Sequence, residues 1–463
     1  MRRRDFIAAI TASVAAACSS AAPEDAVGSS TTAPLPPPTE PTTALSPTIS
    51  STEPLAVDLV TPATVPSTGP ELLDVPFGLG VASGDPDHES VVLWTKVFPV
   101  TGSVVPVSMA YDIALDDGFT KVVGSGLVEA APSDAFTARV VVSGLGSNSR
   151  FWYRFRTHDY TSPVGRTRTM PAPGELPDRF GLAVSSCQSR AYPEFWDWHL
   201  ELATDQTVDM VVWLGDFIYE RSDSRSVDDY RDLYNTYRGD ERLQASSAAH
   251  PWIFTWDDHE VANDYTRNVD RERRAAGYQT WWEHTPTRLP RPTLEGLTVY
   301  RSLDVGGLAR LLLLDCRQYQ DGDTVLGADQ LAWLARASQH DRVHTMVCSP
   351  VIASSLEVED VLPPYAFEAH PADQQQLLAI LSQSPKPFIV SGDLHAAMEM
   401  EFAPGIPEWM APPLSSVFPA EFVQYLPFLP LVSPAVTRAE PSHGYLQVEL
   451  TPSSATPRFP AVP

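Results

Sequence analysis

The sequence predicts a layered α/β domain preceded by a small all-β sandwich domain. From residue 178 onward, short apolar segments typical of buried strands alternate with helix-like segments, which is the order found in α/β proteins. From 71 to 177, short β-type segments are separated by clusters of Gly, Asp, Pro and Ser, which is typical of an antiparallel sandwich. The chain has 463 residues, more than one compact core usually holds, so we expect at least two domains.

Composition and charge exclude several classes of protein. The formal net charge is −26, which argues against nucleic acid and against an anionic membrane surface as partners. An anionic substrate would need local cations to overcome that field, and metal ions are the obvious candidates. Four cysteines in a chain of this length do not form a disulfide framework.

The N-terminus reads as an export signal followed by a tether. Residues 1–18 have a basic start and a short apolar stretch, and Arg3 and Arg4 resemble a twin-arginine signal. A plain secretory signal is the alternative, and it leads to the same compartment. Cys18 follows three alanines, so a lipid anchor at this cysteine stays open. We therefore expect a periplasmic, extracellular or lipid-anchored cell-surface protein. Residues 19–70 are rich in Pro, Ser, Thr and Ala, the composition of a disordered linker.

The sandwich prediction for 71–177 rests on four β-type segments, which are 90–97, 105–115, 138–145 and 150–158. The predicted α/β domain spans 178–452, and a Pro-rich tail follows at 453–463. We expect a mostly parallel sheet flanked by helices. Its strands are predicted within 180–187, 210–216, 252–260, 309–317, 343–350, 388–395 and 445–451, and its helices at 194–204, 227–235, 271–284 and 328–339.

The segment 211–220, VVWLGDFIYE, carries the first sign of a site. A buried-type strand ends at Gly215, where a glycine lets backbone and ions approach, and Asp216 follows at once, with Tyr219 three residues on. Ligands of open α/β sheets bind beyond the carboxyl ends of the strands. Other strands end in residues that bind metals or move protons: Cys187, Asp258, His259, Asp393 and His395. Each alone has a structural explanation, such as a turn, a helix cap or a core residue. Together they predict one site, because the ends of neighbouring strands converge.

Four segments, SSCQS, GDFIYE, WDDHEVANDY and SGDLH, occur in an order that resembles the PhoD-type alkaline phosphatases, within the calcineurin-like metallophosphoesterases. The similarity extends to RRAAGYQTWWEH, LLLLDCRQYQ and HGYLQVELT, and to GVASGDPDHESVVLWTKV in the predicted sandwich. It spans roughly Phe77 to Thr451. It implies that the catalytic domain is a layered α/β domain of the metallophosphoesterase type. Cys316 departs from the family pattern, in which we expect Thr.

The resemblance implies a role for each residue of the site. Asp216 is expected to bridge two metals, Tyr219 to supply a phenolate and Cys187 a thiolate. His259 is expected to act as the acid that protonates the leaving group, and Asp258 to serve as a ligand beside it. The remaining expected ligands are Asp393 and His395. Asn263 and Arg317 are expected either to orient the phosphate or to be structural.

The resemblance also implies the cofactors and the reaction. It implies a mixed centre of Fe³⁺ and Ca²⁺, with other divalent metals as alternatives. The implied function is an exported, metal-dependent alkaline phosphatase that hydrolyses small phosphate esters by attack of a metal-activated water or hydroxide at phosphorus. A phosphodiesterase or phospholipase D-like enzyme would use the same centre. A catalytically silent surface protein is a further alternative, but the complete set of expected ligands favours an enzyme. We expect a monomer.

Overall fold

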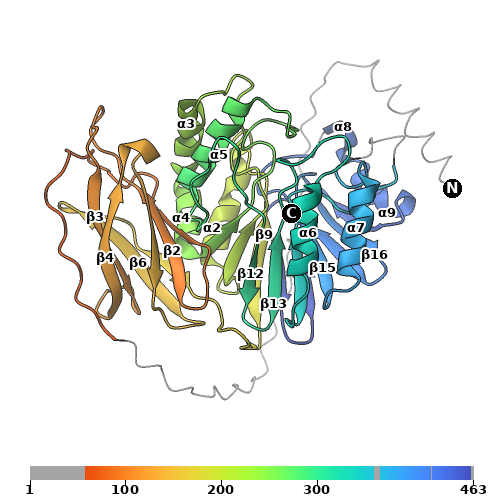
Figure 1. Cartoon of the computed structure of the whole chain (residues 1–463), viewed down its shortest axis with the longest axis horizontal. Helices are drawn as coiled ribbons and strands as arrows, with labels where there is room; N and C mark the ends of the chain where they lie inside the picture. Colours follow the sequence, from red (N-terminus) through yellow and green to blue (C-terminus); the bar gives the residue numbers. More distant parts are fainter. Residues whose placement is uncertain (1–57, 359–364, 419, 460–463) are drawn as a thin grey trace, which may run out of the picture. The chain divides into compact units, whose positions relative to one another are not determined.

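The computed structural model describes residues 58–358, 365–418 and 420–459, which belong to one compact unit (Figure 1). The predicted export signal and most of the predicted linker lie outside the described residues. None of the helices in the described part of the chain combines the length and the apolarity needed to cross a membrane.

Two large sheets form the centre of this unit. The eight-stranded sheet has the order β20 (Ala455–Arg458), β19 (Leu446–Leu450), β9 (Phe180–Ser185), β10 (Met210–Trp213), β11 (Pro251–Phe254), β1 (Val81–Gly84), β2 (Ser90–Lys96) and β5 (Thr137–Ser143). The seven-stranded sheet has the order β12 (Arg301–Val305), β13 (Ala309–Leu313), β14 (His344–Cys348), β15 (Pro387–Ser391), β17 (Ile406–Met410), β16 (Ala397–Ala403) and β18 (Val436–Glu440). Strands β9, β10 and β11 are parallel, as are β13, β14 and β15.

The apolar strands are explained by burial on both faces. Alternate residues of a strand point to opposite faces. In β10, Met210 and Val212 pack in the core between the two sheets, whereas Val211 and Trp213 pack under the helices. A strand covered on both sides reads as a continuous apolar run, and this is the pattern from which these strands were predicted.

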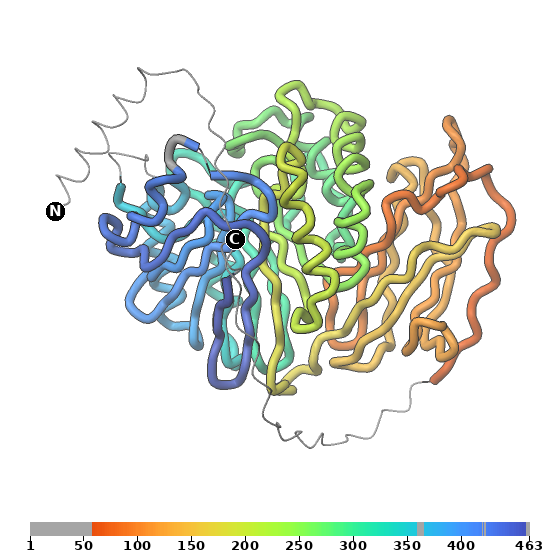
Figure 2. Tube along the Cα trace, turned by 180° about the vertical axis from the view of Figure 1, so that it is seen from behind, coloured from red at the N-terminus to blue at the C-terminus, as the bar shows by residue number. Residues whose placement is uncertain are grey.

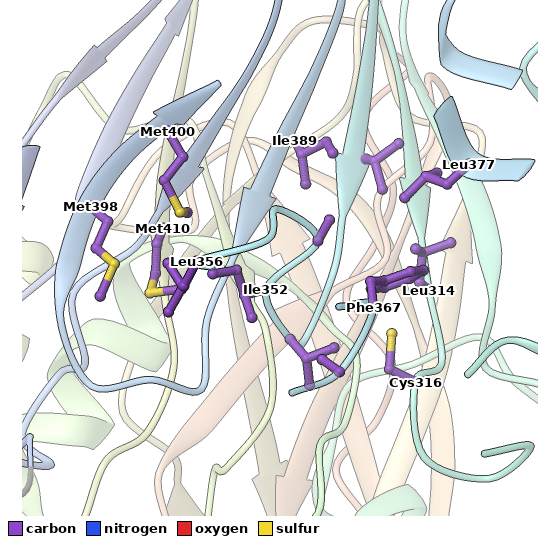
Figure 3. Packing of buried hydrophobic residues seen from close by; sticks show 14 of the residues in the cluster. Leu314, Cys316, Ile352, Leu356, Phe367, Leu377, Ile389, Met398, Met400 and Met410 are labelled. Atoms are coloured by element: carbon purple, nitrogen blue, oxygen red, sulfur yellow. The ribbon is translucent and has the colours of Figure 1, made fainter. Parts of the chain in front are cut away.

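Helices cover the outer faces of both sheets. Beside the first sheet lie η2 (Pro193–Asp197), α2 (Trp198–Thr204), α3 (Val227–Arg238), α4 (Glu241–Ala249) and α5 (Arg271–His284), and beside the second lie α6 (Gly327–Ala337) and α7 (Pro371–Leu381). Three short helices, α8 (Ala420–Val423), η3 (Leu426–Phe428) and α9 (Leu429–Val432), follow later in the chain. Figure 3 shows the core on the outer face of the second sheet, which includes Leu377 and Ile389 and in which three methionines of β16 and β17 gather.

The N-terminal segment forms a sandwich, but one of its two sheets is shared. Strands β4 (Val122–Ala130), β3 (Val107–Ala114), β6 (Arg150–Thr157), β7 (Tyr160–Thr161) and β8 (Gly165–Arg168) form a separate sheet, and η1 (Pro132–Asp134) precedes β5. This sheet packs on β2 and β5 through a core of its own. Because β1 also pairs with β11, the sandwich continues into the eight-stranded sheet. The domain boundary at 177/178 stays a prediction.

Other expectations need correction. One mostly parallel sheet was predicted, and the structure has two sheets packed face to face. The predicted helices at 194–204, 227–235, 271–284 and 328–339 are present, but α4 and α7 were not predicted. The Pro-rich tail contains strand β20, which pairs with β19, and Figure 2 shows this C-terminal hairpin beside the strand that begins the catalytic segment.

Candidate metal centre

The predicted site residues lie in loops that follow the parallel strands at one edge of the sheets. The loops after β9 and β10 are joined directly, since the Cys187 backbone N–H donates to the Gly215 carbonyl at 3.2 Å. Gly215 has a φ of +109°, and a Cβ there would lie 2.4 Å from the backbone nitrogen of Asp257. Glycine is therefore required for the loops after β10 and β11 to come this close.

Four of the expected ligands have left-handed backbone conformations that non-glycine residues rarely adopt. The φ angles are 56° at Cys187, 54° at Asp216, 75° at Asp393 and 53° at His395. Such conformations cost free energy and persist only where the surroundings hold them, and they are concentrated at functional sites. The backbone conformations of these loops are therefore consistent with a functional site.

Ligand atoms from these loops gather within 4.8 Å of one another in three overlapping groups. One group joins Cys187, Asp216 and His395, and a second joins Asp216, Asp258 and His259. The third is made of carboxylates only: Asp216, Asp257, Asp258 and Asp393. Asp216 belongs to all three groups, the position required of a bridging ligand.

Tyr219 completes the first group. Its hydroxyl oxygen lies 3.0 Å from Nε2 of His395 and accepts a hydrogen bond from the Ser416 hydroxyl at 2.7 Å. The Cys187 thiol donates to Asp216 at 3.5 Å, so thiol, phenol, imidazole and carboxylate surround one small space. Burial raises the pKa of the Cys187 thiol and the pKa of the Tyr219 phenol well above their usual values. Both side chains need a nearby cation to become anionic.

The third group, which is made of carboxylates only, also has too little positive charge around it. Burial raises the pKa of Asp216 and of Asp257 well above the usual range, and it raises the pKa of Asp393 to about 6. Burial alone would also raise the pKa of Asp258, but Arg317 and His259 outweigh it and lower that pKa. Among the described residues, the buried Oδ1 of Asp258 has no hydrogen-bond partner. A bound cation would use this free oxygen and relieve the repulsion between the acids.

The donor set fits metal ions of two kinds. A thiolate, a phenolate and an imidazole suit a transition metal, whereas a cluster of carboxylates suits a hard ion such as Ca²⁺ or Mg²⁺. Cys187 and His395 form one group with Asp216, whereas the carboxylates of Asp257, Asp258 and Asp393 form another group with it. The residues present therefore fit a centre of two unlike cations that share Asp216.

His259 is held by an acid that the sequence analysis missed. Its Nδ1 lies 2.7 Å from Oε2 of Glu220, whose other oxygen accepts the backbone N–H of Asn263 at 2.9 Å. Burial disfavours the imidazolium, but Asp216, Glu220 and Asp258 outweigh it and raise the pKa of His259 to about 10. Because Nδ1 is occupied by Glu220, Nε2 is the nitrogen left for another partner. Glu220 ends the same segment as Asp216, and this second acid was the signal available in the sequence.

Arg317 is buried against the acids of the site, and its contacts are with protein groups. The residue is 2% exposed, and its guanidinium donates to both oxygens of Asp257, at 2.5 and 3.1 Å. Nη2 also donates to the Tyr365 hydroxyl at 2.7 Å. The structural alternative fits these contacts. Asn263 is exposed, and its side-chain amide donates to Asp264 at 2.7 Å.

A further buried acid, Glu260, accepts hydrogen bonds from the backbone of the metal-binding loops. The sequence analysis did not predict this role. Its Oε1 accepts the backbone N–H of Phe217 at 2.7 Å, and its Oε2 accepts those of Asp216 at 3.1 Å and Asp257 at 2.9 Å. The side chain thus links the loops after β10 and β11. Its position in WDDHE gave no sign of this role, because the two contacts with the loop after β10 depend on the tertiary fold.

The catalytic part of the chain, residues 182–448, matches the family model described as PhoD-like phosphatase, and residues 63–171 match the model of that family's N-terminal domain. The chain belongs to the PhoD-like phosphatase family. Family membership makes it a phosphoric ester hydrolase, which argues against the alternative of a catalytically silent surface protein. The family that the sequence motifs indicated is confirmed.

Individual relatives agree with the family. The chain is 31% identical over 414 residues to alkaline phosphatase D of Bacillus subtilis strain 168, covering 77% of this chain and 70% of that protein. A solved structure of PhoD superposes with a TM-score of 0.76 at 26% identity, covering 84% of this chain and 90% of that one. A purple acid phosphatase from yellow lupin seeds has a TM-score of 0.58 at 11% identity, covering 80% and 69%, so it shares the fold.

Proposed function

We propose that the chain is an alkaline phosphatase whose centre holds Fe³⁺ and Ca²⁺ and hydrolyses phosphate esters. The observation that carries this proposal is the position of Asp216, which belongs to both the thiol-containing group and the carboxylate group. A carboxylate shared in this way can hold two unlike cations at a fixed separation. In this proposal, Cys187, Tyr219 and His395 hold the iron, whereas Asp258 and Asp393 hold the calcium.

When bound, two adjacent cations polarise the phosphate ester and activate water as the nucleophile. The contribution of the chain is to orient the acid. Glu220 accepts a hydrogen bond from Nδ1–H of His259, which leaves Nε2–H to give a proton to the departing oxygen. The Glu220 carboxylate beside Nδ1 favours the protonated imidazole, which is the form that a general acid needs. Asp258 stands beside His259 and links it to the carboxylate group.

Asn263 and Arg317 receive different roles. We propose that Asn263, which is exposed beside the site, contacts the substrate, since its backbone is fixed by Glu220. The role of Arg317 is to hold Asp257 and the neighbouring acids rather than to bind phosphate.

The identity of the metals is tested by colour and by elemental analysis. A phenolate or thiolate bound to ferric iron gives a visible charge-transfer band. The band is expected in the purified enzyme, to disappear in Tyr219→Phe, which keeps the ring, and to shift in Cys187→Ser. A colourless, fully active enzyme without iron would contradict the iron assignment and leave the phosphatase assignment standing, since divalent ions alone support this chemistry. Assays on a monoester and a diester side by side show which ester class is preferred.

The place of action follows from the N-terminus, whose residues lie outside those that the structure describes. We propose export by the twin-arginine route, on the basis of Arg3 and Arg4 in the basic start of the chain. Cys18→Ser tests the lipid anchor, because that variant leaves the membrane fraction only if Cys18 carries lipid. We further propose that the enzyme acts as a monomer, which the molar mass in solution tests.

A further inference from the structure

A polar side chain lies fully buried directly behind the metal-binding loops and belongs to none of the roles above. Gln188 follows Cys187 in the chain and has no exposed surface. Its backbone N–H donates to the Asp216 carbonyl at 3.1 Å, and its side-chain Nε2 donates to the Phe217 carbonyl at 2.7 Å. Through these two bonds, one residue of the first loop is joined to two successive residues of the second.

The chain of contacts continues away from the site into two helices. Oε1 of Gln188 lies 3.0 Å from Nε2 of His199 in α2, and Nδ1 of His199 lies 2.9 Å from the Ser246 hydroxyl in α4. All three side chains have no exposed surface. We call Ser246, His199, Gln188 and the Phe217 carbonyl the Gln188 relay.

The chemistry of the partners fixes the direction of every hydrogen bond in the relay. The Phe217 carbonyl only accepts, so the amide of Gln188 must turn its NH₂ group toward it and its oxygen toward His199. That oxygen also only accepts, so Nε2 of His199 carries the proton and Nδ1 is an acceptor. The Ser246 hydroxyl then donates to Nδ1, although the Leu243 carbonyl is also within reach at 3.1 Å. Burial lowers the pKa of His199 to about 3, which keeps the imidazole neutral as this arrangement requires.

The relay acts where the backbone needs support. Cys187 and Asp216 both have positive φ angles, and such conformations must be held by their surroundings. Oriented buried hydrogen bonds that point the same way strengthen one another. Each donor of the relay points toward the loop of Asp216, so the two helices fix the separation of the Cys187 and Asp216 loops.

We propose that Gln188 is a positioning residue that holds Cys187 and Asp216 at the separation needed to bind one metal ion between them. The proposal rests on the assignment of these two residues as ligands under the proposed function. Supporting residues of this kind commonly change metal affinity by about 10–100-fold when they are removed.

The test uses Gln188→Met, which keeps the length of the side chain and removes both amide contacts. Ser246→Ala removes the far end of the relay and leaves the Gln188–Phe217 bond. Gln374→Met is the control that makes the same substitution away from the site: the half-buried Gln374 amide donates to the Ala353 carbonyl at 2.7 Å beside the other sheet. The full-length protein is stripped of metal, and alkylation of each cysteine by iodoacetamide is followed by peptide mapping.

In Gln188→Met the Cys187 thiol is expected to react about tenfold faster, because one buried hydrogen bond no longer holds its loop closed. Ser246→Ala is expected to show a smaller increase, and Gln374→Met none. Cys316, which is buried in a different core, is the internal reference and its rate should not change. An equal rise at Cys316 would mean global loosening and would overturn the proposal, as would an unchanged rate at Cys187 in both relay variants.

Binding of Co²⁺ supplies the second measurement, since a thiolate bound to Co²⁺ has a distinct absorption band. Gln188→Met is expected to weaken Co²⁺ binding by about 10–100-fold, whereas Gln374→Met keeps the affinity. A wild-type protein without the thiolate–Co²⁺ band would contradict Cys187 as a ligand, and with it the proposed function of the loop. A normal band and affinity in Gln188→Met would instead contradict the relay alone.

Discussion

Replacing Arg317 by Met separates a residue that holds the metal-binding acids from one that binds phosphate. The guanidinium is 2% exposed and makes two charge-assisted hydrogen bonds to Asp257 and one bond to Tyr365. Removal leaves Asp257 buried and unpaired beside Asp258 and Asp393, which lie within 3.7 Å of the same guanidinium. Breaking a buried ion pair by removing one partner typically costs about 3–5 kcal/mol.

We therefore expect Arg317→Met to lower the free energy of unfolding of the metal-free protein by about 3–5 kcal/mol. Asp257→Asn in the same chain should recover part of that loss, because the unpaired charge is gone. The measurement is chemical denaturation after metal removal, arranged as a double-mutant cycle with both single variants. Arg317→Lys is the control that keeps a charge and loses the paired geometry.

The opposite outcome is equally clear. If Arg317 instead bound substrate, Arg317→Met would keep its stability and its metal content and would raise KM. That combination would refute the role assigned here, since no contact with the acids could then matter to the fold. Stability and KM measured on the same preparation decide between the two.

Three further predictions concern the centre and the export signal. Asp216→Ala is expected to abolish activity and tight metal binding, as chelation does for the wild type, and full activity of the variant would contradict the metal centre. Glu220→Gln removes an acid that raises the pKa of His259, so the alkaline limb of the profile of kcat against pH should move to lower pH. The value of kcat should fall by no more than the ~10²–10⁴-fold that general acid catalysis supplies. A profile that does not move would contradict the pairing of Glu220 with His259. Lysine in place of Arg3 and Arg4 should leave precursor inside the cell, and unchanged export would indicate the general secretory route.

Much of the site could be predicted because local sequence determines it. The apolar run of β10 marks a strand buried on both faces, and Gly215 marks the point at which another loop comes close. Asp216 and Tyr219 follow in the same segment, so their place at the strand end required no knowledge of the fold. The same holds for Cys187 after β9 and for Asp393 after β15.

The residues that were missed act over distances that the sequence does not reveal. Glu260 binds backbone groups of Asp216 and Phe217, which lie more than forty positions earlier in the chain. Gln188 reaches Phe217 across 29 positions, and nothing in SSCQS distinguishes a buried amide from a surface one. The amphipathic pattern also failed for α4, because its buried face includes the polar Ser246 and Ser247. Finally, the apolar pattern of a strand does not indicate which of the two sheets the strand joins.

The centre also links the stability of the fold to metal binding, because two of the carboxylates proposed to bind metal, Asp216 and Asp393, destabilise the protein without it. The pKa of Asp216 is raised on folding, and that of Asp393 is raised to about 6, with burial as the first cause for each. For a carboxyl group whose pKa is higher in the folded than in the unfolded state, folding is most favourable below the unfolded pKa of about 4. The protein loses this stability as the pH rises from the unfolded pKa through the folded pKa. The metal-free protein should therefore lose stability between about pH 4 and 6 and beyond. Metal should remove this loss, because a cation that binds only the folded state stabilises it by mass action. Denaturation curves at pH 5 and 8, with and without chelator, measure the difference. If the free energy of unfolding changed equally with pH in the metal-bound and the metal-free protein, the role of these acids as ligands would be contradicted.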